Sequence, residues 1–213
     1  MYILSNEIEF PPVYLSDEHG FLAVGGDLSE ERLLLAYRSG IFPWYNEEDP
    51  ICWWSPDPRC VLYPENIRIS KSMKKVIASG QFTFKINSSF EAVIRCCKEV
   101  KRKDGYGTWI QEEIVEAYTG LFSSGFACCA EAWQGEKLVG GLYGVKIGKV
   151  FFGESMFSTV SNASKFAFIK FVELLVSEGV RLIDCQQQTT HLESLGAEMI
   201  SREIFINLLD RYC

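Results

Sequence analysis

Three polar side chains near apolar stretches are the strongest candidates for chemistry. Asp184 and Gln186 lie two residues apart at the end of the apolar run 180–185, so strand alternation predicts that both side chains point to one face. A carboxylate there can accept a proton, and the neighbouring amide can hydrogen-bond a carbonyl or an amine. Glu154, in a strand predicted over 149–157, offers a second carboxylate. The pattern also allows Asp184 to cap the following turn and Glu154 to lie on an exposed strand face.

The cysteines show no comparable pattern. The chain has 8 cysteines and 2 histidines, His19 and His191. A structural zinc site needs closely spaced ligand pairs such as Cys-x-x-Cys, and the vicinal cysteines at 96–97 and 128–129 lack that spacing. Most of the cysteines lie in apolar stretches, where a free thiol behaves as a small hydrophobic group. We therefore expect buried or inert thiols and no metal site.

Composition indicates a globular protein. Hydrophobic residues make up 47% of the 213 residues and charged residues 23%, which is typical of a chain that folds around its own core. No run approaches the ~18 consecutive apolar residues that a membrane span needs. The N-terminal residues lack a basic segment followed by an apolar one, so we expect no secretory signal and a cytoplasmic protein.

Basic residues are concentrated in one segment of an acidic chain. The net charge is −7, yet residues 68–103 contain ten basic and two acidic residues. Such a block predicts a surface for a polyanion. The alternative is a pair of solvated helix faces with their Lys and Arg side chains outward.

The sequence pattern changes near residue 57, which predicts two domains. A capping pattern at Asp27 and Ser29 and a stop at Gly40 predict a short helix over about 29–39. Residues 41–59 are dense in Pro and Trp, and the prolines near its end predict irregular backbone there. We place a domain boundary near Asp57, with a small N-terminal domain over 1–57 and a larger domain over 58–213.

The larger domain is predicted to be of the α+β class. Its three-strand meander, followed by a long helix and a further strand, implies a mixed sheet with helices on its faces. The predicted helices cover 70–79, 88–102, 111–123, 162–179, 190–195 and 202–211, and the predicted strands cover 82–86, 127–133, 137–147, 149–157 and 180–185.

Nine short motifs, in order and at matching spacing, then carry a family resemblance. They are Gly25 to Ser29, Arg38 to Tyr45, Trp53 to Arg59, Gly107 to Ile110, Leu138 to Gly144, Phe152 to Ser158, Ala163 to Lys165, Leu182 to Gln186, and His191 with Ser194 to Ala197. With these motifs the chain resembles the bacterial leucyl/phenylalanyl-tRNA–protein transferases along nearly its whole length.

The resemblance implies a fold and a reaction. It implies a small N-terminal domain and a larger domain similar to the acetyltransferase (GNAT) fold. The implied enzyme moves Leu, Phe or, less readily, Met from aminoacyl-tRNA to proteins that begin with Lys or Arg, which marks them for degradation by the N-end rule. It implies no cofactor, neither a metal nor coenzyme A.

The resemblance also implies roles for particular residues. Asp184, Gln186 and Glu154 are expected at the reacting centre, where Asp184 would orient the acceptor's α-ammonium group and accept its proton. The aminoacyl pocket is expected to include Leu142 and Ile183, with Trp44 and Trp109 against the terminal adenosine and Tyr118 at the border, although ordinary core packing is the alternative for each. The tRNA-binding residues are expected to be Arg68, Lys71, Lys74, Lys75, Lys101, Arg102 and Lys103.

Two other functions remain open at this point. An acetyl-CoA-dependent N-acetyltransferase would need a glycine-bearing pyrophosphate loop after the third meander strand, and residues 158–164 contain no glycine there. A non-catalytic tRNA-binding module would leave Asp184, Gln186 and Glu154 without a role. Fold alone does not decide among these functions.

Overall fold

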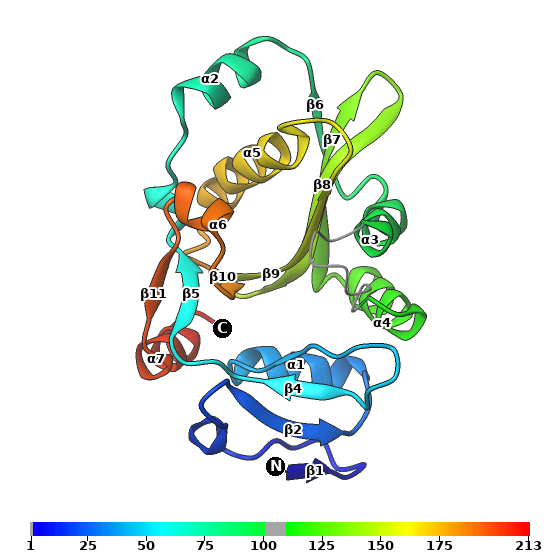
Figure 1. The fold of residues 1–213 in the computed structure, drawn as a ribbon, viewed down its shortest axis with the longest axis vertical. Helices are drawn as coiled ribbons and strands as arrows, with labels where there is room; N and C mark the ends of the chain where they lie inside the picture. The colour runs from blue at the N-terminus through cyan, green and yellow to red at the C-terminus, as the bar shows by residue number, and fades with distance from the viewer. Residues whose placement is uncertain (1, 101–109) are drawn as a thin grey trace.

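A computed structural model describes residues 2–100 and 110–213 of the chain. Figure 1 shows two sheets with helices packed on them. The smaller sheet has the order β1-β2-β4-β3, and the larger sheet has the order β11-β5-β10-β9-β8-β7-β6. The strands are β1 Tyr2–Leu4, β2 Phe21–Gly25, β3 Phe42–Pro43, β4 Cys52–Trp54, β5 Arg59–Leu62, β6 Thr83–Ile86, β7 Ala127–Gln134, β8 Lys137–Ile147, β9 Val150–Ser158, β10 Leu182–Gln186 and β11 Glu198–Ile200.

The helices begin and end where capping chemistry places them. In α1, Ser29 caps the first turn by accepting a hydrogen bond from the Arg32 amide, and Gly40 follows the end with φ +73°. The predicted helix over about 29–39 is therefore confirmed. The helices are α1 Glu30–Arg38, α2 Lys71–Ala78, α3 Phe90–Glu99, α4 Glu112–Ser123, α5 Ala163–Ser177, α6 Thr190–Ser194 and α7 Arg202–Tyr212, with short 3-10 helices at Val13–Leu15 and Pro64–Asn66.

The prediction of irregular backbone around the prolines is wrong for residues 52–54. Strand β4 forms between Pro50 and Pro56, and it pairs with both β2 and β3. Both prolines lie outside the strand, so neither removes a hydrogen bond of the ladder. Proline therefore marks the ends of this strand rather than preventing it.

The larger sheet is mixed, as predicted. Strands β7, β8 and β9 form the antiparallel meander, β10 pairs in parallel with β9, and β5 pairs antiparallel with β10. The α+β class with a mixed sheet is thus confirmed. Strands β5 and β11 were not predicted, because each has only three or four residues and neither alternates in polarity.

Helices cover both faces of this sheet. Helix α5 lies on one face with α2, and helices α3 and α4 lie on the other (Figure 1). Helix α5 approaches β8 closely at Gly140, where a Cβ atom would lie 2.7 Å from the Cβ of Ala163. A side chain at this position would push the helix away from the sheet, which gives the Gly140-Gly141 motif a packing role.

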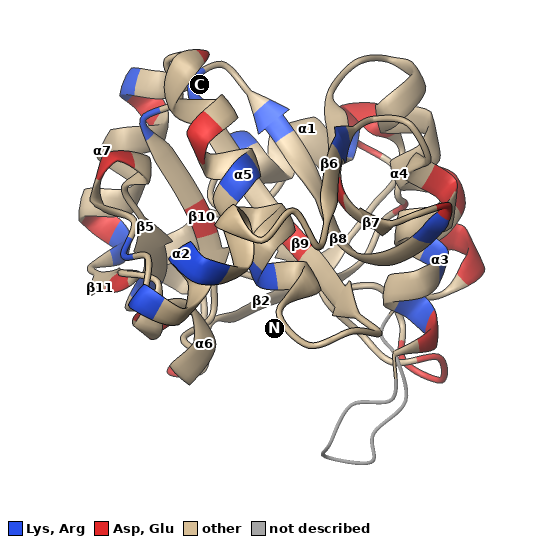
Figure 2. Cartoon of the chain, turned by 90° about the horizontal axis from the view of Figure 1, so that it is seen from above, with Lys and Arg blue, Asp and Glu red and all other residues tan. Residues whose placement is uncertain are grey.

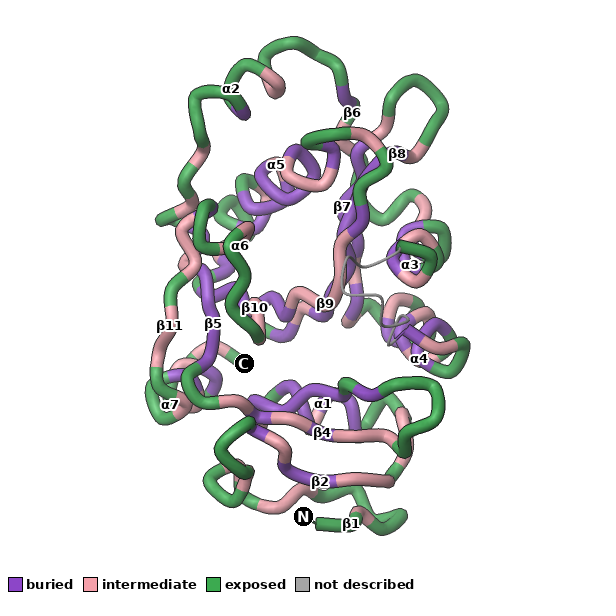
Figure 3. Tube along the Cα trace, in the orientation of Figure 1, coloured by how far each residue is buried: buried purple, intermediate pink, exposed green. Residues whose placement is uncertain are grey.

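One hydrophobic cluster spans the two sheets. It includes Leu33 and Trp53 from the N-terminal part and Phe152 and Phe205 from the larger part, all fully or almost fully buried (Figure 3). The division at residue 57 stays a prediction, but side chains from both sides of it pack into a shared core. Among the described residues, no helix has the length and apolar character that crossing a membrane requires.

Candidate active site

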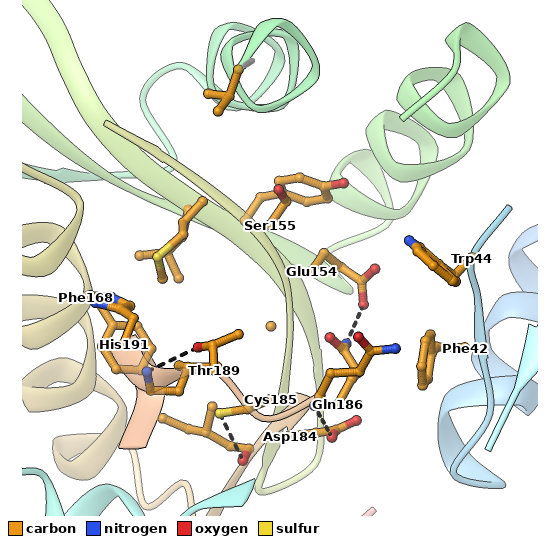
Figure 4. A pocket seen from close by; sticks show the side chains of 18 of the residues that line it. Phe42, Trp44, Glu154, Ser155, Phe168, Asp184, Cys185, Gln186, Thr189 and His191 are labelled. Atoms are coloured by element: carbon orange, nitrogen blue, oxygen red, sulfur yellow. Dashed lines mark hydrogen bonds between the residues drawn. The ribbon is translucent and has the colours of Figure 1, made fainter. Parts of the chain in front are cut away.

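A pocket opens where strands β9 and β10 separate. The parallel pairing ends at Asp184 and Phe152, while both strands continue beyond those residues. The diverging ends leave a cavity of about 370 Å³, lined by β9, β10 and the segment Phe42–Trp44 from the small sheet (Figure 4). The separation of two parallel strands is therefore the structural origin of the site.

The end of β10 departs from simple alternation. The register with β5 shifts between Asp184 and Gln186, and Gln186 has a positive φ of 55°. The Gln186 amide donates to Asp184 Oδ1 at 2.9 Å. Both side chains line the same pocket, as predicted, but a bulge at Cys185 rather than regular strand alternation places Gln186 there.

Asp184 forms a buried, bidentate ion pair with Arg59. The Arg59 Nε atom lies 2.8 Å from Asp184 Oδ1 and its Nη2 atom lies 2.7 Å from Oδ2. Both side chains are almost completely buried, and the guanidinium group packs between the rings of Phe42 and Phe205. Arg59 also donates to the carbonyl of Gly40. Asp184 thus contacts the pocket while both of its oxygens are already engaged.

Glu154 is the second carboxyl group of the pocket, and its partners are neutral. Its Oε1 atom accepts from Tyr37 at 2.8 Å and from Gln186 Nε2 at 3.1 Å, and its Oε2 atom accepts from Tyr118 at 3.1 Å. Burial raises the pKa of Glu154 to about 7, although the two tyrosine hydrogen bonds lower it. The alternative of an exposed strand face is therefore wrong for Glu154.

Tyr37 and Tyr118 are fully buried, and their hydroxyl groups hydrogen-bond each other as well as Glu154. Burial and the nearby Glu154 carboxyl raise the pKa of both tyrosines well above the usual value. Tyr118 was predicted to border the site, whereas Tyr37 had no predicted role. Arg59 was part of a motif without an assigned role. Nothing in the local pattern links either residue to Glu154 or Asp184.

The other end of the pocket is mainly apolar, although His191 and Thr189 lie beside Phe168 there (Figure 4). Leu142 and Ile183 line it as expected, and they are joined by Met156 and Phe168, which sequence reasoning missed. Trp44 lies at the opposite end of the pocket, near Gln186 (Figure 4), and is 38% exposed. Trp109, the other expected stacking residue, lies outside the described residues.

The basic segment divides into two groups in space. Lys71, Lys74 and Lys75 are exposed on α2, and none of them forms an ion pair within the described part of the chain. On α3, by contrast, Arg95 and Lys98 pair with carboxylates of α3 and α4. Figure 2 shows α2 and α3 well apart, as does Figure 1. A single continuous basic surface is therefore not formed by these two helices.

The remaining expected tRNA contacts are only partly described. Arg68 precedes α2, and its amide donates to the carbonyl of Leu195 at 2.8 Å. Lys101, Arg102 and Lys103 lie outside the described residues. Within residues 2–100 and 110–213, no three His, Cys, Asp or Glu side chains gather as a metal site would require.

The pocket as a whole combines two kinds of surface. One end can bind an apolar side chain, and the other presents two carboxyl groups and the amide of Gln186. Such a site suits a reaction between an apolar acyl group and a cationic or amine-bearing partner, because Glu154, which has only neutral partners, can attract the cation and exchange a proton near neutral pH.

Comparison with known proteins gives consistent matches over almost the whole chain. The family model described as leucyl/phenylalanyl-tRNA protein transferase matches residues 61–210, and the model of that family's N-terminal domain matches residues 26–57. A leucyl/phenylalanyl-tRNA–protein transferase from Christiangramia forsetii is 55% identical over 98% of this chain and 100% of its own length. The protein of the same name from Flavobacterium johnsoniae is 53% identical over 98% of this chain and 99% of its own length. Among solved structures, a GCN5-related N-acetyltransferase from Kribbella flavida matches with a TM-score of 0.41 and 8% identity over 79% of this chain and 60% of its own.

Proposed function

The chain belongs to the leucyl/phenylalanyl-tRNA–protein transferase family of aminoacyltransferases, and we propose that it moves Leu and Phe, and less readily Met, to proteins that begin with Lys or Arg. The donor is an aminoacyl-tRNA, and the acceptor is the free α-amino group of the protein. The added residue would mark the acceptor for degradation by the N-end rule in the cytoplasm.

The observation that carries this proposal is the division of the pocket. Leu142, Met156, Phe168 and Ile183 form an apolar end that suits the side chain of Leu, Phe or Met. A charged aminoacyl side chain would lose its hydration there without meeting an opposite charge among the described residues, so we expect it to be excluded. At the other end, the Glu154 carboxylate, which has no cationic partner among the described residues, would attract an acceptor that carries a cationic side chain beside its amine.

The chemistry needs positioning, loss of a proton and stabilisation of an oxyanion. The ester at the 3′ end of the tRNA is already activated, and only the neutral amine attacks it. An α-amino group has a pKa of about 7.7–8.0, so a modest shift suffices. Holding both substrates in attack geometry can contribute on the order of 7–11 kcal/mol in favourable cases. Gln186, whose amide reaches Glu154, can hydrogen-bond the amine or the carbonyl, and no covalent enzyme intermediate is required.

Binding of the tRNA would be largely electrostatic. The exposed lysines at 71, 74 and 75 have no acidic partner among the described residues and can contact phosphates. Arg68 lies beside them in sequence, and Lys101, Arg102 and Lys103 are proposed to contribute as well. Trp44 and Trp109 are proposed to contact the terminal adenosine, because stacking on an aromatic ring contributes about 1–3 kcal/mol per base.

A transfer assay with matched acceptors tests the proposal. Radiolabelled Leu-tRNA is incubated with a peptide that begins with Arg, with the same peptide acetylated at its N-terminus, and with a version that begins with Asp. Label on the free Arg peptide alone supports the reaction, the amine nucleophile and the preference for a basic acceptor. Label on the Asp peptide instead would reject the proposed acceptor class, and no label on any peptide while tRNA still binds would favour a binding module.

A further inference from the structure

Side chains from three other elements converge on the carboxyl group of Glu154. Glu154 projects from β9, Tyr37 reaches it from α1, Tyr118 from α4 and Gln186 from β10. Figure 4 shows Glu154 beside Gln186, facing the space between Trp44 and Asp184. Tyr37 belongs to the part of the chain before residue 57, so a helix of the N-terminal part completes the surroundings of a pocket residue.

When Glu154 is ionised, the hydroxyl groups of Tyr37 and Tyr118 supply fewer hydrogen atoms than the oxygen–oxygen contacts of this cluster require. Each tyrosine hydroxyl carries one hydrogen, yet three oxygen–oxygen contacts join Tyr37, Tyr118 and Glu154. A proton on the carboxyl group would supply the third hydrogen. The cluster can therefore hold Glu154 in its protonated form without leaving a buried oxygen unpartnered.

Asp184 has no such freedom. Its two oxygens accept two hydrogen bonds from Arg59 and one from the Gln186 amide, and the side chain is fully buried. A proton on Asp184 would break charge-assisted hydrogen bonds and leave the Arg59 guanidinium buried without its counter-charge. The geometry thus separates two carboxyl groups of the same pocket into one that is fixed and one that can exchange a proton.

We infer that Glu154 accepts the proton of the acceptor amine, that Tyr37 and Tyr118 position its carboxyl group, and that Asp184, paired with Arg59, takes no proton. This inference rests on the proposed function and deepens it. It assigns the transfer to a residue other than the one expected from sequence, because Asp184 was the expected acceptor.

The proton balance of the reaction is complete. The α-ammonium group gives one proton to the Glu154 carboxylate, and the neutral amine forms a bond to the ester carbonyl carbon. The bond from that carbon to the 3′-oxygen of the ribose then breaks. The 3′-oxygen takes the second proton of the amine, and Glu154 returns its proton to solvent. The products are an amide, a 3′-hydroxyl group and one proton, with no oxidant, metal or co-reactant.

The surroundings of Glu154 determine how its ionisation should respond to substitution. The groups that face it are the hydroxyls of Tyr37 and Tyr118, the amide of Gln186, the Asp184 carboxylate and the Arg59 guanidinium. The tyrosine hydrogen bonds favour the charged form and lower its pKa. Removing either hydroxyl should therefore raise the pKa of Glu154 and move the pH dependence of transfer to higher pH.

The test is the pH dependence of kcat with both substrates saturating, between about pH 5 and 9. The unmodified enzyme should lose activity as the pH falls through about 7. This fall in kcat on the acidic side is the acidic limb of the pH profile. Glu154→Gln should lower kcat by roughly 10²–10⁴-fold and replace this acidic limb by one at about 7.7–8.0, where the acceptor's own α-amino group loses its proton. Asp184→Asn should lower kcat yet keep the limb, and Tyr37→Phe should move the limb to higher pH. Tyr45→Phe is the matched control, because its hydroxyl also bonds a carboxylate of the larger part, Glu113, away from Glu154.

Each result decides one question. A limb that stays at about 7 in Glu154→Gln, or that disappears in Asp184→Asn, would overturn the inference. If Glu154→Gln does not fold, a limb that stays in place in both Tyr37→Phe and Tyr118→Phe overturns it instead. A carbon-13 NMR titration of the free enzyme should find one glutamate that titrates near 7 and is absent from the Gln variant, a readout that needs no turnover. Failure of the unmodified enzyme to label the Arg peptide would reject the proposed function, whatever the titration shows.

Discussion

Replacing Arg59 by Met should destabilise the protein strongly, because it leaves a buried carboxylate without its counter-charge. Arg59 is 1% exposed and Asp184 is fully buried, and the pair shares two short hydrogen bonds. Removal of one partner from such a pair costs about 3–5 kcal/mol. For a chain of this size, each kcal/mol lowers Tm by about 2–4 °C, so the loss should be roughly 6–20 °C.

The expected loss has a structural cause beyond the charge. The Met side chain can fill much of the space between Phe42 and Phe205, where the guanidinium now packs 4.8 and 4.7 Å from the ring centres. It cannot donate to Asp184 or to the Gly40 carbonyl. The penalty should therefore come from the unpaired carboxylate and the lost donors rather than from a cavity. Arg59→Lys keeps the charge but not the planar, two-point contact with Asp184. Its stability should therefore lie between that of the unmodified protein and that of Arg59→Met.

A double-mutant cycle isolates the pair. Asp184→Leu alone leaves Arg59 buried and unpaired, whereas Arg59→Met combined with Asp184→Leu removes both charges. Urea unfolding of the four proteins, followed by tryptophan fluorescence, gives each free energy of unfolding. The double variant should lose much less stability than the sum of the single variants. Additive losses, or a cost below about 1 kcal/mol for Arg59→Met, would refute the assignment of a strong buried ion pair.

Three further predictions concern other parts of the molecule. Replacing Lys74 and Lys75 by Gln should raise KM for Leu-tRNA and weaken its dependence on salt, with little change in KM for the acceptor peptide in the same kinetic assay. Leu142→Phe should narrow the apolar end of the pocket and reduce transfer of Phe more than transfer of Leu, by about 10-fold or more in the ratio of the two kcat/KM values. Burial raises the pKa of Glu131, but hydrogen bonds from Ser88, Trp133 and the Ser89 amide outweigh burial and lower the pKa below its usual value. Its contribution to stability should be present at neutral pH and lost as the pH falls below about 4, and urea unfolding across pH should find this loss absent from Glu131→Gln.

Local patterns were enough for most helices and for the meander. The Ser29 cap and the Gly40 stop bound α1, and the turns around Gly135 and Gly148 separate β7, β8 and β9. Capping, glycine turns and periodicity act within a few residues, so a single sequence records them directly. The short strands β5 and β11 have no such local pattern. They are stabilised by pairing with strands that are distant in sequence, β5 with β10 and β11 with β5.

The sequence predicted residues that line one pocket, but not the contacts between them. Asp184, Gln186 and Glu154 were identified, yet the partners that set their behaviour lie far away in sequence. Arg59 precedes Asp184 by 125 residues, and Tyr37 precedes Glu154 by 117. Periodicity indicates which face of an element is buried, but it does not say which side chain lies opposite. The bulge at Cys185 was hidden for a similar reason, since no glycine marks the positive φ at Gln186.

The two carboxyl groups of the pocket illustrate why residue type alone does not assign a role. Asp184 meets a cation that binds both of its oxygens, whereas Glu154 meets neutral donors within a partly closed cavity. The first environment stabilises a fixed charge, and the second makes gain and loss of a proton comparable in free energy near neutral pH. An ammonium group that must lose its proton needs a group of the second kind beside it, whereas the Arg59–Asp184 pair fixes the end of β10 that carries Gln186. Because Arg59 begins β5 of the larger sheet, Tyr118 lies on α4 and Tyr37 lies on α1, both parts of the chain supply the partners that make the two carboxyl groups different.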